Sequence, residues 1–342
     1  MMRLPKFSYR VPRTVAEAVK IIADVGPDAQ FVAGGPDLYP NMKRRQQMPK
    51  TVISVMRLPE LNQITGDGKS GVIIGASVTL TDIVENSILK RDYPVVASAA
   101  RTISTPILRN MGTIGGNLLL DTRCNYYDQN YEWRKAINFC LKKDGDICWV
   151  APGSSKCWAV QSSDLVPVMV AIGAKLRLVS TLGERVIDAA GFYNDDGIDY
   201  LQKRPDELLV DIHLPPTNGW RASYQKLRRR GAFDFPVLGV AAFVRYESSA
   251  STSTVPEGRV SAAIADAKIV LGGIAPSPIQ VDEAARALIG SALDAERIEA
   301  AAEAAYVKAR PLDNTDFVYQ WRKQMARQYT LRALNDVRSQ LE

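Results

Sequence analysis

The pattern of apolar and polar residues predicts alternating helices and strands over the first 118 residues. Thr14 and Glu17 have the spacing of a capping box and predict a helix that reaches about Val25. Strands are expected over 30–33, 51–55 and 72–76, and helices over 36–42, 81–89 and 93–102. This alternation favours an α/β or α+β layer over an all-helical or all-β domain.

The later part of the chain predicts an apolar helix, then strands, then two terminal helices. The helices are expected over 165–172, 294–310 and 316–340, and the strands over 175–180, 208–214, 223–227, 237–246 and 267–271. Pro215-Pro216 and the run 217–219 indicate a boundary between a domain of residues 1–218 and one of residues 219–342. Phe317, Trp321 and Met325 share one face of the last helix, which we interpret as core packing. Ser248–Thr254 is expected to be an exposed loop.

Two glycine turns are candidate ligand contacts. Gly34-Gly35 follows a predicted strand, and Pro36 stands at the first expected helical position. Free N–H groups at such a turn can hold a phosphate, although the same pattern also suits an ordinary tight turn. The second turn, Gly112–Asn117, allows a ligand to approach the backbone closely, or simply connects two strands.

All four cysteines lie in one segment, at Cys124, Cys140, Cys148 and Cys157. Four thiolates suit either tetrahedral zinc or an iron–sulfur cluster. The spacing lacks the short C-x2–4-C pair that is usual in structural zinc sites, so it favours a 4Fe-4S cluster. Zinc and free or disulfide-linked thiols remain open alternatives on spacing alone.

Composition narrows the class of protein. The 342 residues are 46% hydrophobic and 23% charged, which is ordinary for a soluble globular protein of two or more domains. There is no apolar run of membrane-spanning length and no apolar signal region, so we expect a cytoplasmic protein with reduced thiols.

Charge and histidine content argue against two further functions, nucleic-acid binding and histidine-rich metal chemistry. The net charge of +6 comes with basic runs at 43–45 and 228–230, which we interpret as solvated surface or mild steering of an acidic partner. No nucleic-acid motif accompanies these runs, so no nucleic-acid partner is expected. His213 is the only histidine, which excludes histidine-rich metal chemistry, and its place in a predicted strand suggests a structural role.

Three motifs together resemble the FAD-binding subunit of the xanthine oxidase family of molybdenum enzymes. They are the runs 31–38, 109–117 and 162–167. The run 224–227 and the C-terminal layout are similar to the second domain of that subunit, so the resemblance covers essentially the whole chain. It implies an α+β fold with a two-part FAD-binding domain, followed by a smaller α+β domain of a sheet and terminal helices.

The resemblance also implies roles for individual residues. The FAD pyrophosphate is expected at Val32, Ala33, Gly34, Gly35, Pro36, Asp37 and Leu38. The ribityl chain and flavin are expected at Ile103, Thr113, Ile114, Gly115, Gly116 and Asn117, with Asp164 and Lys226 at the flavin end. Pro36 departs from the family pattern because it has no N–H to donate to a phosphate, so neighbouring N–H groups must serve.

About 40 residues, roughly 121–161, separate the second and third motifs, which are contiguous elsewhere in the family. This insert is similar to the one in the beta subunit of the 4-hydroxybenzoyl-CoA reductases, where it holds a 4Fe-4S cluster. The resemblance therefore implies Cys124, Cys140, Cys148 and Cys157 as cluster ligands. It implies a subunit that passes electrons from reduced ferredoxin through 4Fe-4S and FAD, with no catalytic side chain of its own.

The implied partners carry the remaining cofactors. A molybdenum-cofactor subunit and a 2Fe-2S subunit would complete a dimer of heterotrimers that dehydroxylates 4-hydroxybenzoyl-CoA to benzoyl-CoA. The closest alternative is a related hydroxylase that oxidises another aromatic or N-heterocyclic substrate. A second alternative is an assembly scaffold whose insert binds zinc.

Overall fold

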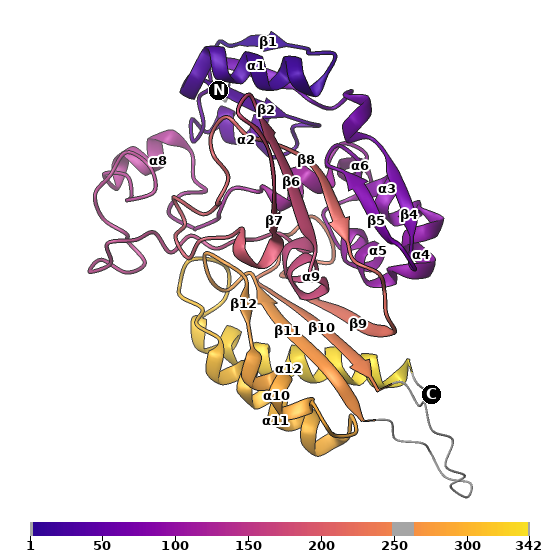
Figure 1. Cartoon of the computed structure of the whole chain (residues 1–342). Coiled ribbons are helices and arrows are strands. Elements are labelled where there is room, and N and C mark those ends of the chain that lie inside the picture. The colour runs from indigo at the N-terminus through magenta and orange to yellow at the C-terminus, as the bar shows by residue number, and fades with distance from the viewer. Residues whose placement is uncertain (1–2, 248–262, 341–342) are drawn as a thin grey trace, which may run out of the picture.

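The computed structural model describes residues 3–247 and 263–340, which form three sheets with helices packed around them (Figure 1). The loop expected at Ser248–Thr254 lies outside these residues. The first sheet is parallel, in the order β1-β3-β2, with β1 at Ser8–Arg10, β2 at Ala29–Val32 and β3 at Thr51–Ser54. Helix α1 (Val15–Val25) begins as expected, since the Thr14 hydroxyl accepts a hydrogen bond from the Glu17 N–H over 3.1 Å.

The second sheet is antiparallel and has five strands in the order β4-β5-β8-β6-β7. The strands are β4 (Ile64–Asp67), β5 (Gly71–Gly75), β6 (Lys175–Ser180), β7 (Gly183–Asp188) and β8 (Leu208–Leu214). His213 lies on β8, and its Nε2 atom is 2.7 Å from the Asp211 carboxylate. This contact fits the structural role expected from the sequence.

Short helices lie in the connections within the first two sheets, one between β2 and β3 and the others between β5 and β6. They are α2 (Leu38–Lys43), α3 (Leu80–Glu85), α4 (Ser87–Asp92), α5 (Pro94–Arg101), α6 (Pro106–Arg109) and α7 (Ile114–Leu118). The single helix predicted over 81–89 was wrong, because Asn86 adopts an extended conformation that ends α3. The Asn86 side chain then accepts a hydrogen bond from the Leu89 N–H and caps α4.

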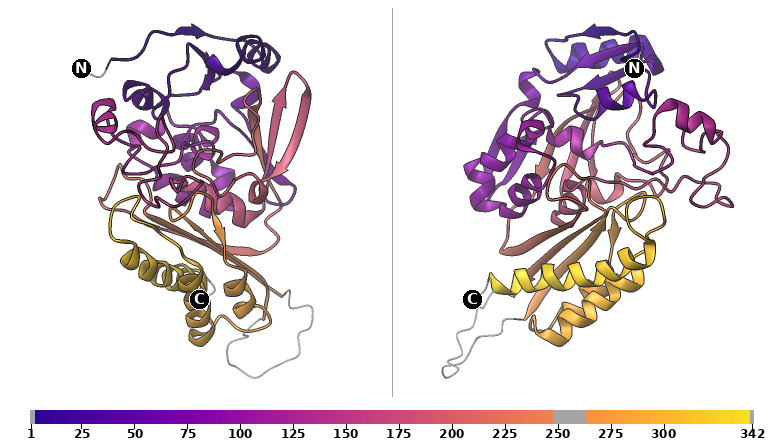
Figure 2. Two further views of the ribbon diagram at one scale, coloured as in Figure 1. Left: turned by 90° about the vertical axis from the view of Figure 1, so that its left-hand side faces the viewer. Right: turned by 180° about the vertical axis from the view of Figure 1, so that it is seen from behind.

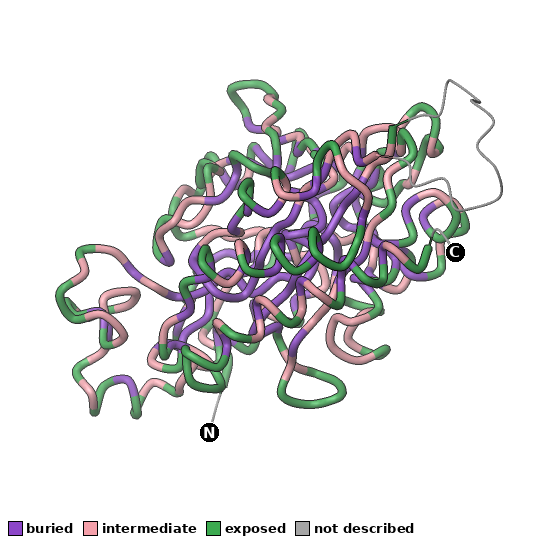
Figure 3. Tube along the Cα trace, turned by 90° about the horizontal axis from the view of Figure 1, so that it is seen from below, coloured by how far each residue is buried: buried purple, intermediate pink, exposed green. Residues whose placement is uncertain are grey.

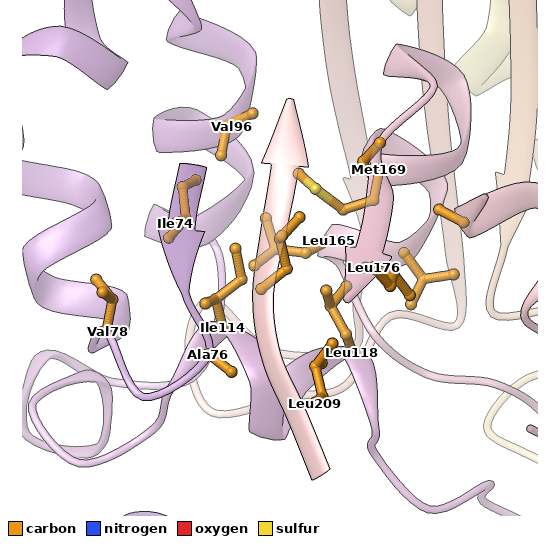
Figure 4. Close-up of a cluster of buried hydrophobic side chains, with 14 of the residues drawn as sticks. Ile74, Ala76, Val78, Val96, Ile114, Leu118, Leu165, Met169, Leu176 and Leu209 are labelled. Carbon is orange, nitrogen blue, oxygen red and sulfur yellow. The ribbon is translucent and has the colours of Figure 1, made fainter. Parts of the chain in front are cut away.

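Helix α9 (Leu165–Ile172) lies at the centre of the molecule, and every one of its residues except Ile172 is buried. Figure 4 shows its Leu165 and Met169 side chains in one cluster with Ile114 and Leu176. The opposite side of α9 meets the third sheet so closely that a Cβ atom on Gly272 would lie 2.5 Å from the Pro167 ring. The main core therefore extends across both parts of the chain.

The third sheet is antiparallel in the order β12-β11-β10-β9. Its strands are β9 (Trp220–Leu227), β10 (Leu238–Tyr246), β11 (Ile264–Gly272) and β12 (Ile279–Gln280). Helices α10 (Asp282–Leu288), α11 (Ala295–Lys308) and α12 (Tyr319–Ser339) cover the face of this sheet that points away from α9 (Figure 2). A second apolar core fills the space between them.

The core role predicted for Phe317 and Trp321 was wrong, because the two side chains are 43% and 38% exposed. Helix α12 begins only at Tyr319, and Phe317 has a positive φ of 67° before it. The two rings contact each other at the surface in a tilted arrangement, with centroids 4.8 Å apart and an angle of 44° between their planes. Met325 does pack against the second core.

The insert at roughly 121–161, called the cysteine segment below, projects from the body beside α2. It contains one helix, α8 (Tyr131–Ala136) (Figure 1). Buried positions concentrate in the middle of the molecule, while projecting loops are mainly exposed or half-buried (Figure 3). Among the described residues, none of the helices has both the length and the apolar character that crossing a membrane requires.

We expect Arg322→Met to lower the free energy of unfolding by about 3 kcal/mol, because it leaves buried carbonyl groups without donors. Arg322 is fully buried and donates to the carbonyl oxygens of Val237, Leu312 and Gly273 over 3.2, 2.9 and 2.7 Å. Urea unfolding followed by fluorescence measures the change. Arg332→Met on the exposed face of α12 is the matched control, and equal stability of the two variants would contradict the prediction.

Candidate cofactor pocket and cysteine segment

A cavity of about 620 Å³ lies where the first sheet, α7 and the loop before β8 meet. Almost all the predicted FAD-contacting residues line it, namely Val32, Ala33, Gly34, Gly35, Pro36, Asp37, Leu38, Ile103, Thr113, Gly115, Gly116, Asn117 and Asp164. Two predicted residues do not. Ile114 is fully buried in the main core, and Lys226 lies behind Asp164.

The first glycine turn forms one wall of the cavity through close backbone contact. A Cβ atom on Gly34 would lie 1.8 Å from the carbonyl oxygen of Met111, so only glycine allows this approach. Gly35 has a φ of +77°, and a Cβ atom there would collide with the Tyr39 ring. The helix predicted to start at Pro36 starts instead at Leu38, because the chain turns at Gly35 before entering α2.

The second glycine run is not a simple loop but the start of α7. The Thr113 hydroxyl caps this helix by accepting a hydrogen bond from the Gly116 N–H over 3.1 Å. A Cβ atom on Gly115 would lie 2.7 Å from Ala76, whereas Gly116 has only the Thr113 hydroxyl nearby. Gly115 therefore allows packing, and Gly116 leaves room at the wall of the cavity.

The third motif closes the cavity and joins it to the C-terminal sheet. Asn117 accepts a hydrogen bond from the Ser163 hydroxyl over 2.5 Å, which connects α7 to the start of α9. Asp164 is 2% exposed and accepts from the Lys226 ammonium over 2.9 Å and from the Tyr224 hydroxyl over 2.8 Å. Burial raises the pKa of Tyr224 well above its ordinary value, so its hydroxyl remains a donor to Asp164.

Sequence reasoning missed the part of the lining that comes from distant loops. These residues are Arg44, Gln47, Asp121, Arg123, Ile198, Asp199, Tyr200, Leu201, Lys203, Phe233 and Phe235. Burial lowers the pKa of Lys203 to about 8, so an anion beside it would favour its charged form. No local motif marks these positions, since tertiary folding alone brings them to the cavity.

The four cysteine thiols are all free and buried. Cys124, Cys140 and Cys157 share a small core with Tyr127 and Ala159. Burial, with a smaller contribution from the other three thiols, raises the pKa of Cys124 to about 12, and burial raises that of Cys157 to about 11. Ligation of a metal would therefore have to displace protons from these two sulfurs.

Among residues 3–247 and 263–340, no group of three or more His, Cys, Asp or Glu side chains is arranged to hold a metal ion. The prediction of four metal ligands therefore has no support from metal-binding geometry in this structure and stays a prediction. What the structure does show is four buried thiols from well-separated positions in one small region.

The loop 195–201 contacts both Cys157 and the cavity. A Cβ atom on Gly197 would lie 2.8 Å from the Cys157 sulfur, and the Gly197 N–H donates to the Cys157 carbonyl over 2.9 Å. A few residues later, Tyr200 and Leu201 line the cavity. The same short loop therefore contacts the Cys157 sulfur and lines the cavity.

The residues of the cavity fit an extended dinucleotide. Its volume lies in the range typical of ligand sites, and the glycine turns bring backbone to its surface without side chains in the way. Apolar Val32, Leu38 and Ile103 line it together with the polar Asn117 and Asp164. This combination suits FAD, which has aromatic rings at both ends and a charged pyrophosphate between them.

Comparison with protein families divides the chain into two matches. Residues 5–217 match the family described as the FAD binding domain in molybdopterin dehydrogenase. Residues 222–337 match the CO dehydrogenase flavoprotein C-terminal domain. The first match alone covers more than half of the chain.

Two curated relatives are similar over most of their length. The chain is 29% identical to the carbon monoxide dehydrogenase medium chain of Hydrogenophaga pseudoflava, covering 97% of this chain and 96% of the relative. It is 32% identical to the aldehyde oxidoreductase FAD-binding subunit of Escherichia coli K12, covering 81% of this chain and 84% of the relative.

A solved structure gives the same result for the fold. A chain of the Hydrogenophaga pseudoflava carbon monoxide dehydrogenase superposes with a TM-score of 0.79 at 27% identity, covering 98% of this chain and 99% of that one. The mixed helix-and-sheet fold with an FAD-binding domain and a C-terminal domain is thereby confirmed. The chain belongs to the FAD-binding subunits of the xanthine oxidase family of molybdenum hydroxylases, of the carbon monoxide dehydrogenase medium-chain type.

Proposed function

We propose that this chain is the FAD- and 4Fe-4S-containing electron-transfer subunit of a 4-hydroxybenzoyl-CoA reductase. It accepts electrons from reduced ferredoxin and passes them to partner subunits that carry 2Fe-2S clusters and the molybdenum cofactor. The observation that carries the proposal is the group of four buried thiols, one of which, Cys157, contacts Gly197 in a loop whose next residues line the cofactor cavity. When bound, the cluster transfers single electrons and FAD stores one or two.

The chain's own residues would bind and shield the two groups. The turn at Gly34 and the helix start at Gly116 would expose backbone to the FAD, while Pro36 offers no N–H donor and leaves that task to its neighbours. Cys124, Cys140, Cys148 and Cys157 are proposed as cluster ligands. The Ala159 N–H lies 3.4 Å from the Cys157 sulfur, a contact that tunes the reduction potential of a sulfur-ligated group.

The family assignment supports FAD directly, whereas the names of the relatives mention no 4Fe-4S cluster. The cluster therefore rests on the thiol set and on the insert's resemblance. A zinc-binding scaffold is the weaker alternative, because the cysteine spacing lacks the short C-x2–4-C pair that is usual in structural zinc sites. No side chain of this chain is proposed to be catalytic.

The main alternative is the FAD subunit of a related molybdenum hydroxylase with another substrate. One relative, 27% identical, is the nicotine 6-hydroxylase medium subunit of Paenarthrobacter nicotinovorans, which acts on an N-heterocycle by name. The site described here serves both reactions equally, since substrate chemistry would take place on a partner subunit. A cytoplasmic dimer of heterotrimers is proposed in either case.

The substrate proposal predicts a specific product from the purified complex. With reduced ferredoxin and 4-hydroxybenzoyl-CoA under anaerobic conditions, we expect benzoyl-CoA, detected by mass spectrometry. Omission of ferredoxin is the control. If the complex instead hydroxylates N-heterocycles and forms no benzoyl-CoA, the hydroxylase alternative replaces the proposal.

Replacement of Cys140 by Ser should remove a cluster ligand. We expect the variant to lose most of its iron and acid-labile sulfide and its ferredoxin-driven flavin reduction, while its FAD content stays at the native level. Iron and sulfide analysis with flavin absorbance measures all three. Stoichiometric zinc in the native protein, or native reduction rates in the variant, would count against the electron-accepting role.

Replacement of Gly34 by Ala should empty the FAD site, because the new Cβ atom would lie 1.8 Å from the Met111 carbonyl oxygen. The two walls of the cavity must then separate, so we expect FAD content to fall at least about tenfold. Gly153→Ala is the matched control, since a Cβ atom there meets nothing within 4 Å. Full FAD content in the Gly34 variant would refute the assignment of this turn.

A further inference from the structure

The cavity is lined by carboxylates even though the cofactor it suits is an anion. Four of these carboxylates are each paired with a cation, in the pairs Asp37–Arg123, Asp121–Lys142, Asp164–Lys226 and Asp234–Arg230. The last two cations belong to the C-terminal domain. The first two belong to the cysteine segment, so cations of this segment are paired with carboxylates that line the cavity.

Arg123 occupies the point where three parts of the chain meet. It is 7% exposed and pairs with Asp37 of the first glycine turn. It also pairs with Asp128 of the cysteine segment over 3.1 Å, and its guanidinium lies 4.4 Å from the centre of the Phe235 ring. Its Nε atom is buried and has no hydrogen-bond partner among residues 3–247 and 263–340, so these residues leave one donor of the side chain unused.

Lys142 makes a similar contact with Asp121, which also lines the cavity. Both side chains are 7% exposed, and the ammonium is 2.9 Å from the Asp121 carboxylate. The ammonium also donates to the Thr122 hydroxyl over 2.8 Å and to the Gly197 carbonyl. The Tyr127 and Tyr200 rings lie 4.9 and 5.2 Å from it, so the pair is held in an enclosed site.

These pairs matter because the FAD pyrophosphate is negatively charged. An unpaired Asp37 or Asp121 beside that group would repel it strongly in a site with little water. We propose that the cysteine segment is part of the FAD site, with Arg123 and Lys142 neutralising the cavity carboxylates so that the pyrophosphate can bind. This role is additional to electron transfer and rests only on FAD binding, so it does not depend on which metal the cysteines hold.

The test compares two flavins in the full-length chain freed of FAD. Arg123→Gln should weaken FAD binding about tenfold or more, since it leaves Asp37 unpaired beside the pyrophosphate. The affinity for riboflavin, which has no phosphate, should change by less than about twofold. Dissociation constants come from flavin fluorescence. Lys143→Gln, a charge change at a half-exposed position of the same segment, is the control and should leave both affinities unchanged.

A double variant separates charge from packing. Asp37→Asn combined with Arg123→Gln removes both charges of the pair, so FAD affinity should return to within about threefold of the native value. Equal losses for FAD and riboflavin, or no recovery in the double variant, would overturn the proposal. If Arg123→Gln fails to fold, Lys142→Gln with Asp121→Asn/Lys142→Gln gives the same comparison at the second pair.

These outcomes are distinct from failure of the proposed function. A protein without iron that still shows the selective loss of FAD affinity would retain this inference and lose the electron-accepting role. Native iron content together with unchanged FAD affinity in both Arg123→Gln and Lys142→Gln would retain the electron-accepting role and overturn this inference.

Discussion

The burial of α9 on all sides is the constraint on which the rest of the structure depends. An apolar helix of eight residues with almost no exposed surface needs a partner on every face, and here two sheets supply them. Its first turn holds Asp164, and Ser163 just before it connects to Asn117. Packing of the core thus fixes the position of one wall of the cofactor cavity relative to the C-terminal sheet.

The shape and charge of the cavity depend on two constraints, one steric and one electrostatic. The glycines act through the absence of a side chain, which lets two backbone segments touch at Gly34 and Met111. The carboxylates act through pairing, which lets acidic residues line a site for an anion. The first constraint is local to a turn, whereas the second joins residues that are far apart in the chain.

The sequence revealed the parts of the site that are coded locally. The turn at Gly34 carries its geometry in a few adjacent residues, and the apolar run at 165–172 indicated a helix with the observed bounds. Asn86 shows the limit, because the apolar pattern continues through a position where the backbone becomes extended and divides the helix. Periodicity alone does not detect a capping residue such as Asn86, which lies between the polar residues Glu85 and Ser87.

Long-range contributions to the site could not be predicted. Arg123 and Phe235 are 112 positions apart, yet both line the cavity, and no pattern in either neighbourhood specifies their meeting. Phe317 and Trp321 illustrate the reverse error, since their helical spacing suggested a core face that begins only after them. Aromatic spacing indicates a shared face but not whether another element covers it.

The β-bridge between Arg123 and Val160 has an evolutionary consequence. The two residues exchange backbone hydrogen bonds of 2.8 and 2.7 Å, so the 36 residues between them leave and rejoin the body at adjacent points. A pair of antiparallel residues can be closed by a turn of two residues, so the pairing at the stem does not itself require an excursion of this length. A lineage that lost the excursion would keep Arg123 at the stem but would lose Lys142, and Asp121 would then lack that cation.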